Sequence, residues 1–322
     1  MPQVIGRRAL LAGMATGGAF AMLQAPSAAA ARKSFFERAG LPVGLQTYTL
    51  GDEPSRDLDA TFARIAQIGY RELELPNLYG RKPAEVRQAA DRAGLKVSSL
   101  HLPAMSGPGA AGLMLTSAPS EIADALGALG ATRAVMPIFM FPADFRPRTG
   151  ETFQVAIGRS VAAGGPDLWK RTAALLNEKG AALRPLGINV GYHNHNVEFA
   201  PIGATNGWEI LVKETDPALV HFEVDVGWIA TAGHDPAVFL KQHKGRVAQL
   251  HVKDVAKDNA VNYALSMKPA EVGAGVLDWA RILPAAYQAG VRHFYVEQEP
   301  PFALPRMEAI TRSYGYLAQL KA

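Results

Sequence analysis

The chain has 322 residues, 48% of them hydrophobic and 19% charged, with 31 Gly and 22 Pro. This composition is typical of a globular protein and lies far from the disordered and fibrous classes. No cysteine is present, which excludes disulfides, thiolate metal sites and cysteine nucleophiles. The net charge of +4 comes from 33 basic and 29 acidic residues. No basic footprint of the kind that binds nucleic acid is visible, so we expect no nucleic-acid partner.

Residues 1–31 are predicted to form an export signal. Arg7 and Arg8 precede an apolar run over 9–23, and small residues follow it. This order is typical of a removable signal, and the paired arginines resemble a twin-arginine leader. The run is too short for a comfortable membrane span, so we expect a periplasmic or secreted protein without stable membrane insertion. A general secretory signal or a membrane anchor is the alternative.

After the leader, short apolar strands alternate with helix-length segments, which predicts a parallel sheet with crossover helices. Glycines at the predicted helix ends, such as Gly69, Gly94 and Gly290, suit the positive φ of a helix C-cap. The predicted strands are Val43–Leu50, Tyr70–Pro76, Lys96–Pro103, Thr132–Phe139, Ile188–His195, Val220–Trp228, Arg246–Asp254 and His293–Glu299. Eight such units are what an α/β closed barrel requires, the (β/α)8 or TIM barrel. We therefore expect a single barrel domain over 40–322.

Two long connections interrupt this alternation. Met140–Gly164 follows the fourth predicted strand and has weak periodicity. We expect it to be a lid or a substrate wall, or else a surface excursion. Ala256–Gly275 is an insertion after the seventh predicted strand.

Ionisable residues recur two apart at the ends of the last four predicted strands, on the face where barrel enzymes keep their chemistry. Residues two apart on a strand share a face, so both members of each pair are expected to point into the barrel mouth. The pairs are His193 with His195, Glu223 with Asp225, His251 with Lys253, and Glu297 with Glu299. Burying such groups without partners would be costly. A shared cation would turn them into ligands, and mixed oxygen and nitrogen donors suit Mn, Mg, Co or Zn.

Longer motifs surround these residues: Tyr-His-Asn-His-Asn-Val-Glu-Phe at 192–199, Glu-Val-Asp-Val-Gly-Trp at 223–228, Gly-Arg-Val-Ala-Gln-Leu-His-Val-Lys-Asp at 245–254, Val-Gly-Ala-Gly-Val-Leu-Asp-Trp at 272–279 and Tyr-Val-Glu-Gln-Glu at 295–299. They resemble the xylose isomerase-like barrel superfamily, and within it the sugar phosphate isomerase/epimerase branch that includes inosose dehydratase-like proteins. The resemblance runs from Val43 to the C-terminus. It is specific for the fold and less so for the reaction, because the superfamily hosts isomerases, epimerases, dehydratases and nucleases.

The resemblance implies one divalent metal ion at the ends of strands five to eight, with Mn2+ first and Mg2+, Co2+ or Zn2+ as alternatives. Carried over position by position, the implied ligands are His193, Asp225, His251 and Glu297. Most relatives have Glu at the first of these positions. Two alternatives stay open for the first ligand, His193 itself or Glu198 five residues further on.

The histidine at 193 disfavours epimerisation by two opposed carboxylates, because Glu297 alone is clearly in place. Metal-assisted removal of a proton next to a carbonyl, with loss of a β-hydroxyl or β-alkoxyl, is the simpler interpretation. We expect His195 to be the acid/base and Lys253 to stabilise the enolate oxygen. The residues expected to line the sugar pocket are Glu198, Trp228, His101 and Gln46.

Several of these residues also have a structural interpretation. His195 can orient a metal ligand, and Lys253 can pair with Asp254 or Glu299. The other candidates with a structural alternative are His101, Gln46 and the pair Glu72 and Glu74, which can bind Arg71. The histidines expected to be solvated are His221, His234, His243 and His293.

We therefore expect an exported metal-dependent isomerase, epimerase or lyase that acts on a small-molecule sugar, keto-sugar or polyol. Export and the lack of a phosphate cradle argue against a phosphorylated substrate. The narrower expectation is elimination from a 3-keto sugar, with aldose–ketose isomerisation as its rival. A non-catalytic periplasmic carbohydrate-binding barrel and a metal-dependent phosphodiesterase are the alternatives from other classes. The oligomeric state stays open, a homo-oligomer included.

Overall fold

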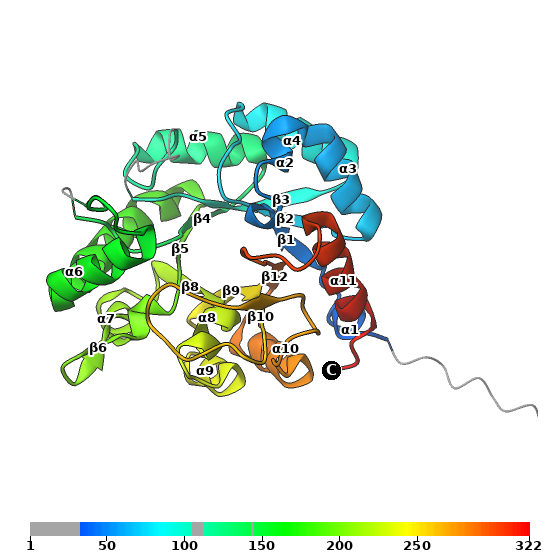
Figure 1. Ribbon diagram of the computed structural model, residues 1–322. Coiled ribbons are helices and arrows are strands. Elements are labelled where there is room, and N and C mark those ends of the chain that lie inside the picture. Colours follow the sequence, from blue (N-terminus) through cyan, green and yellow to red (C-terminus); the bar gives the residue numbers. More distant parts are fainter. Residues whose placement is uncertain (1–32, 105–111, 143–144) are drawn as a thin grey trace, which may run out of the picture. The chain divides into compact units, whose positions relative to one another are not determined.

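The computed structural model describes residues 33–104, 112–142 and 145–322. Eight parallel strands close into a barrel in the order β1-β12-β9-β8-β5-β4-β3-β2, and helices surround them (Figure 1). The barrel strands are β1 (Gly44–Gln46), β2 (Glu72–Leu75), β3 (Lys96–His101), β4 (Arg133–Met136), β5 (Asn189–His193), β8 (Val220–Asp225), β9 (Val247–Val252) and β12 (His293–Val296). The predicted (β/α)8 barrel is confirmed.

The helices pack around the barrel and cover its apolar face. They are α1 (Phe35–Ala39), α2 (Glu53–Arg56), α3 (Leu58–Ile68), α4 (Pro83–Ala93), α5 (Pro119–Leu129), α6 (Phe153–Leu183), α7 (Gly207–Glu214), α8 (Val226–Thr231), α9 (Pro236–Gln242), α10 (Trp279–Ala289) and α11 (Arg306–Gln319). The alternate residues Val224 and Leu250 of the strands join the hydrophobic core, as period-two patterning requires. Gly69, Gly94 and Gly290 end α3, α4 and α10 with φ of 128°, 69° and 117°, so the predicted helix ends are confirmed.

Most predicted strands run past the observed strand ends, and two of them run into helices. The strand predicted to reach Leu50 ends at Gln46, because the 3-10 helix η1 (Thr47–Leu50) follows β1 directly. The strand predicted to reach Trp228 ends at Asp225, whose Oδ1 accepts the backbone N–H groups of Gly227 and Trp228. This side chain caps α8, so Asp225 ends the strand and begins the helix.

Helix α6 begins inside the segment Met140–Gly164, which the sequence predicts as a loop. Thr152 caps its start by accepting the N–H of Val155. The helix is kinked at Gly165, where φ is 50°, and Pro166 follows. These two residues interrupt the apolar periodicity and explain why the helix is hidden in the sequence. The loop prediction is wrong from Phe153 onward.

The predicted insertion Ala256–Gly275 is held in place by one buried carboxylate. It lies between β10 (Asp254–Val255) and the segment that follows β11 (Pro269–Ala270), and these two short strands pair antiparallel. Asp254 accepts four N–H donors, from the backbones of Val255, Gly273 and Leu277 and from the Trp279 indole. Both ends of the insertion are therefore fixed to the barrel. The other short elements are η2 (Arg184–Leu186), η3 (Val197–Phe199), β6 (Pro201–Ile202) and β7 (Thr205–Asn206).

The compact unit begins at Lys33, before the domain start that the sequence predicts at residue 40. Phe35 and Phe36 of α1 pack edge-on against Phe294 of β12, with ring centroids 6.0 and 5.6 Å away. Helix α1 is therefore part of the barrel fold. The predicted export signal at 1–31 lies outside the described residues. Among the residues that are described, every helix is too short or too polar to span a bilayer.

Candidate active site and metal centre

The predicted metal ligands converge at the carboxyl end of the barrel. His193 ends β5, Asp225 ends β8, His251 lies on β9 and Glu297 directly follows β12. One donor atom from each lies within 4.8 Å of the donors of the other three, and all four side chains are buried. We call this group the acidic set.

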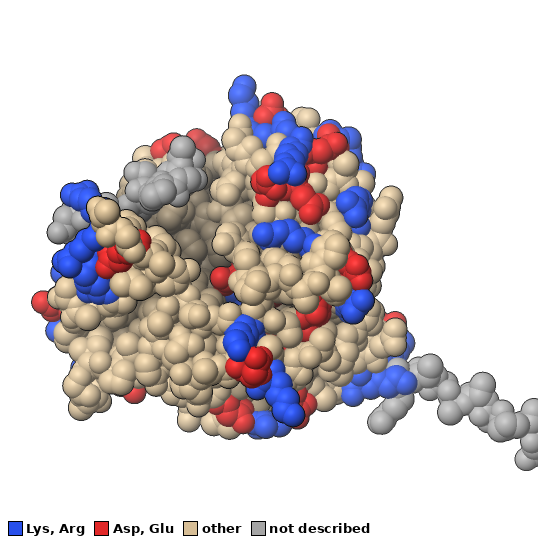
Figure 2. Space-filling view, in the orientation of Figure 1, with Lys and Arg blue, Asp and Glu red and all other residues tan. Residues whose placement is uncertain are grey.

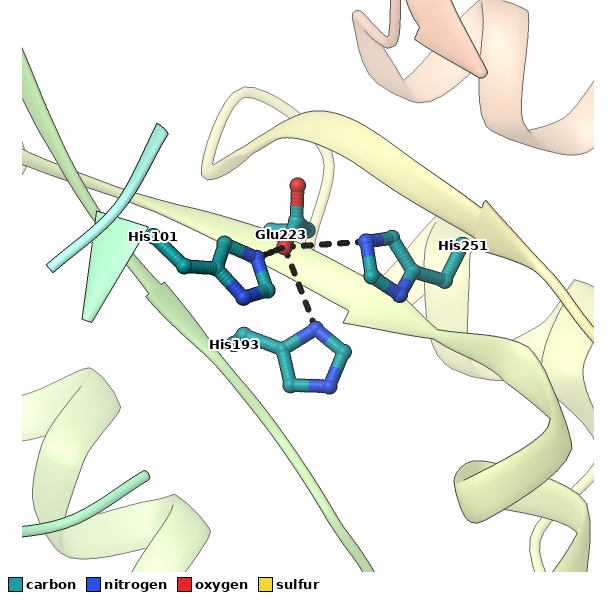
Figure 3. A group of neighbouring side chains, drawn as sticks. All are labelled: His101, His193, Glu223 and His251. Atoms are coloured by element: carbon teal, nitrogen blue, oxygen red, sulfur yellow. Dashed lines mark hydrogen bonds and ion pairs between the residues drawn. The ribbon is translucent and has the colours of Figure 1, made fainter. Parts of the chain in front are cut away.

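A second group of donors shares His193 and His251 with the acidic set. Its other members are His101 of β3 and Glu223 of β8, and its donor atoms also lie within 4.8 Å of one another. Figure 3 shows the three imidazoles directed at Glu223. Glu223 Oε2 is 3.0 Å from His101 Nε2, 3.1 Å from His193 Nδ1 and 3.2 Å from His251 Nε2. We call this group the histidine set.

Glu74 of β2 lies beside the histidine set and is fully buried. Its Oε2 is 2.6 Å from His251 Nε2 and 3.3 Å from His101 Nε2, and it accepts a 2.9 Å hydrogen bond from Gln46 Nε2. Burial opposes the charged form of His101, but Glu74 and Glu223 raise its pKa to about 9. Without a metal ion, these carboxylates are therefore neutralised by protonated imidazoles.

Lys253 directly follows β9 and supplies a buried ammonium group to the acidic set. Its Nζ lies 2.6 Å from Asp225 Oδ2, 2.8 Å from Glu297 Oε2 and 2.7 Å from Glu299 Oε1. Burial opposes the charge, but these three carboxylates raise the pKa of Lys253 well above its usual range. The predicted pairing with Glu299 is confirmed, whereas Asp254 binds N–H groups of the insertion instead.

A cavity of about 310 Å³ opens onto both sets. Figure 2 shows a hollow in this face of the molecule, with mainly uncharged side chains on its visible walls. The polar lining is His101, His193, His195, Gln154, Glu297 and Glu299, and the apolar lining includes Tyr48, Phe141, Phe153 and Leu265. Among the described residues, neither Lys nor Arg lines this cavity. A second cavity of about 610 Å³ shares Pro76 and His101 with it.

His195 presents a free nitrogen beside the cavity. Its Nδ1 is buried and has no hydrogen-bond partner among the described residues, and its ring lies 5.5 Å from the ring of Trp228. Burial, assisted by the charge of Lys253, lowers the pKa of His195 to about 3. The imidazole is therefore neutral at neutral pH, but a pKa this low makes it a weak base, which does not support the acid/base role expected from the sequence.

Three residues predicted to line the sugar pocket are buried and do not belong to the lining of this cavity. Glu198 is fully buried, and its carboxylate accepts hydrogen bonds from the Tyr192 hydroxyl at 2.6 Å and the His195 backbone at 3.0 Å. Trp228 is buried, with its ring 5.3 Å from Lys253 Nζ. Gln46 binds Glu74. Glu198 belongs to neither donor set, which favours His193 over Glu198 as the first ligand.

Two histidines expected to be solvated lie inside the barrel. His293 Nδ1 is 2.7 Å from Glu72 Oε1, so Glu72 pairs with this histidine rather than with Arg71. His221 Nε2 is 3.0 Å from Gln249 Oε1, and Gln249 Nε2 donates to Glu223 Oε1 at 2.9 Å. The sequence already indicated that His221 points into the barrel, because it stands two residues before Glu223 and therefore on the same inward face of β8.

The chemistry of both sets fits a divalent cation. They offer imidazole nitrogens and carboxylate oxygens in a buried pocket, which are the donors that Mn2+, Co2+ and Zn2+ accept. The buried Asp225 Oδ2 accepts no well-directed hydrogen bond, although Lys253 Nζ lies 2.6 Å away. The two donor sets and Glu74 together hold four buried carboxylates, Glu74, Glu223, Asp225 and Glu297. Lys253 and the protonated His101 and His251 offset their charge, and a bound cation would take over that role from the imidazole protons.

A sequence model of the xylose isomerase-like TIM barrel family matches residues 62–319. The chain belongs to this family. Inosose dehydratase of Lacticaseibacillus casei is 25% identical over 293 residues, which cover 82% of this chain and 90% of that protein. The structure of a sugar phosphate isomerase/epimerase from Parabacteroides distasonis superposes with a TM-score of 0.65 at 25% identity, over 92% of this chain and 97% of the other.

A xylose isomerase domain protein from Alicyclobacillus acidocaldarius superposes with a TM-score of 0.59 at 17% identity, over 87% of this chain and 99% of the other. At that identity the likeness shows the fold alone. The family resemblance read from the motifs at the strand ends is thus confirmed, and the chain spans nearly the full length of these relatives.

Proposed function

We propose that this protein is a divalent-metal-dependent enzyme that isomerises, epimerises or dehydrates a sugar, keto-sugar or polyol without a phosphate group. The observation that carries the proposal is the convergence of buried imidazoles and carboxylates against a cavity of about 310 Å³. The names of the relatives, inosose dehydratase and sugar phosphate isomerase/epimerase, support the same class of reaction.

The charge of the cavity lining supports an unphosphorylated substrate. Glu297 and Glu299 line the cavity, and the described part of its wall contains neither Lys nor Arg. A phosphate group would meet two carboxylates and no guanidinium or ammonium on this wall, which is the opposite of the usual phosphate site. We also propose that the predicted leader directs export of the protein to the periplasm or the medium. Sugar phosphates are not expected in those compartments.

The residues around the cavity suit proton transfer next to a carbonyl. A bound divalent cation, with Mn2+ first among Mg2+, Co2+ and Zn2+, would polarise a substrate carbonyl and acidify the adjacent C–H. His193 and His251, the members common to both donor sets, would hold it. His195, at the cavity wall, is the residue placed to take this proton and return it to a departing oxygen, although burial lowers its pKa to about 3 and so weakens it as a base. The Lys253 ammonium keeps the neighbouring carboxylates charged.

Solvent deuterium incorporation tests the proposal. The protein is incubated with Mn2+ and a panel of 3-keto sugars in deuterated water, and NMR and mass spectrometry detect exchange, isomers and dehydrated products. We expect deuterium at the carbon next to the carbonyl, and His195→Gln should slow its incorporation by about 100-fold or more. The exposed His234 provides the matched control, because His234→Gln should leave the rate unchanged.

Three outcomes would contradict the proposal. Binding of a sugar without any exchange or product would identify a carbohydrate-binding barrel. Exchange at equal rates in metal-loaded and metal-stripped protein would show that the reaction does not need the cation. Hydrolysis of phosphodiesters in place of sugar chemistry would favour the phosphodiesterase alternative.

A further inference from the structure

The cavity that opens onto the donor sets has an apolar part that the proposed function does not use. Besides two prolines, the apolar residues of its lining come from segments far apart in the sequence and are Tyr48, Ile138, Phe141, Phe153 and Leu265. We call these five residues the apolar wall. The same cavity is lined by the ionisable residues described above, so a ligand bound there contacts both kinds of surface.

Two aromatic rings of the apolar wall are exposed. The exposed fraction is 47% for Tyr48 and 43% for Phe153. No other phenylalanine among the described residues is exposed to this degree. Apolar surface that remains exposed in a concave site is typical of a binding surface.

The Phe153 ring is held in position by two further rings. Phe141 and Phe145 stack with their centroids 4.3 Å apart, and the Phe153 ring packs edge-on against both, at 6.3 and 6.0 Å. Phe153 is also the first residue of α6, whose start is capped by Thr152. The exposed ring therefore belongs to a packed aromatic cluster at a fixed helix end.

Leu265 is held in the apolar wall in a backbone conformation that leucine rarely adopts. Its φ is 51°, in the left-handed region. Its N–H donates to Oδ1 of the fully buried Asn196 at 3.1 Å, and Asn196 Nδ2 donates to the backbone and side-chain oxygens of Asn262 at 2.9 Å. Such a conformation persists only where its surroundings impose it, and it occurs often at ligand sites. The hydrogen bonds of Asn196 thus fix an unfavourable loop conformation that places a leucine in the cavity lining.

The chemistry of the apolar wall does not suit a group that carries many hydroxyls. Within the wall only the Tyr48 hydroxyl can form a hydrogen bond, and Gln154 is the polar neighbour at the start of α6. Sugar hydroxyls against Phe153 and Leu265 would lose hydrogen bonds to water without replacing them, which costs free energy. An aromatic group would lose none and would gain contacts between rings.

The available space suits a ligand larger than one sugar ring. The cavity of about 310 Å³ and the second cavity of about 610 Å³ have Pro76 and His101 in common. Leu78 and Tyr79 continue the apolar lining in the second cavity. Pockets of about 300–1,000 Å³ hold ligands of several rings.

We propose that the substrate is a glycoside with an aromatic aglycone, and that the apolar wall binds the aglycone while the sugar faces the donor sets. This inference rests on the proposed function and names its substrate class. In elimination from a 3-keto glycoside, C2 loses its proton, the C1–O bond breaks and a double bond forms between C1 and C2. The departing oxygen takes up the proton, so the aglycone is released as a phenol. The segment that carries Phe141 and Phe153 is then the substrate wall, one of the alternatives that the sequence left open.

Binding of unoxidised glucosides tests the aglycone site without any turnover. Isothermal titration calorimetry on Mn2+-loaded protein gives the dissociation constants of phenyl glucoside, methyl glucoside and the disaccharide cellobiose. We expect wild type to bind phenyl glucoside at least about 10-fold more tightly than the other two. Phe153→Ala and Leu265→Asn should each lower this preference by about fivefold or more. Asparagine tolerates the left-handed conformation, so Leu265→Asn changes the wall and keeps the loop.

Val155→Ala is the matched control. Val155 is 58% exposed, lies two residues from Phe153 on α6 and does not line the cavity, so the variant should keep the wild-type preference. Circular dichroism confirms that each variant is folded. Equal affinity of wild type for phenyl and methyl glucoside, or no measurable binding of either, would overturn the inference. A phenyl preference that survives in both wall variants would also overturn it, and tighter binding of cellobiose would identify a second sugar subsite instead.

The binding measurements and the proposed function can fail separately. If phenyl glucoside is preferred through the apolar wall but no 3-keto glycoside exchanges its proton, the aglycone site stands and the proposed function fails. If phenyl and methyl 3-keto glucosides exchange at equal rates, and Phe153→Ala does not change the ratio, the function stands and the aglycone site fails.

Discussion

Replacing Glu198 by glutamine isolates the cost of ionising a buried carboxyl group. Burial raises the pKa of Glu198 to about 7 from 4.5, although hydrogen bonds from Tyr192 and His195 oppose the shift. Because the folded protein holds this proton more tightly than the unfolded chain, the free energy of unfolding falls as the pH rises from about 4.5 to about 7. A shift of this size corresponds to at most about 3 kcal/mol.

The assay compares wild type and Glu198→Gln by thermal and urea unfolding at pH 5 and pH 8. The variant cannot ionise at this position, so its stability relative to wild type should rise between the two pH values by up to about 3 kcal/mol, or roughly 5 °C in Tm for a chain of this size. Glu121→Gln, at an exposed position of α5, serves as the control and should follow wild type. Parallel pH profiles for wild type and Glu198→Gln would refute the reasoning.

Three further measurements concern stability. Asp254→Ala removes the acceptor of four N–H groups and should lower the free energy of unfolding by about 3 kcal/mol or more, whereas exposed Asp258→Ala should change it by less than about 0.5 kcal/mol; similar urea midpoints would contradict this. Gly207→Ala places a Cβ 2.3 Å from the Trp169 ring and should cost about 1–3 kcal/mol. Gly158→Ala, in open space on α6, should stabilise the protein by about 0.5–1 kcal/mol. A higher Tm for Gly207→Ala than for Gly158→Ala would contradict both expectations. Adding Mn2+ at about 100 times its Kd to chelator-stripped protein should raise the stability by about 2.7 kcal/mol, and an unchanged Tm would show that no folded-state site is filled.

The fold was predictable because each unit carries its own signals. Apolar strands, helix-length segments and glycines such as Gly94 recur along the chain, and each is a local feature. The errors arose where one side chain overrides a pattern. Asp225 turns a strand end into a helix cap, and Gly165 with Pro166 hides the periodicity of α6.

The site was predictable in its members but not in its pairings. Strand alternation placed His193, Asp225 and His251 on one face, and the structure brings them together. The ion pairs of Lys253 with three carboxylates join residues from strands that are far apart in sequence, and they depend on how deep each side chain lies in the barrel. The 2.6 Å contact between Glu74 and His251 crosses the barrel in the same way, so the sequence alone does not predict it.

The metal content of a His251→Ala variant tests the presence of the metal centre most directly, since His251 belongs to both donor sets. Wild type, His251→Ala and the control His234→Ala are loaded with Mn2+, passed through a desalting column and analysed by inductively coupled plasma mass spectrometry. Wild type and His234→Ala should retain about one equivalent, and His251→Ala less than about a tenth of that. Wild type that retains no metal, or His251→Ala that retains as much as wild type, would contradict the metal centre.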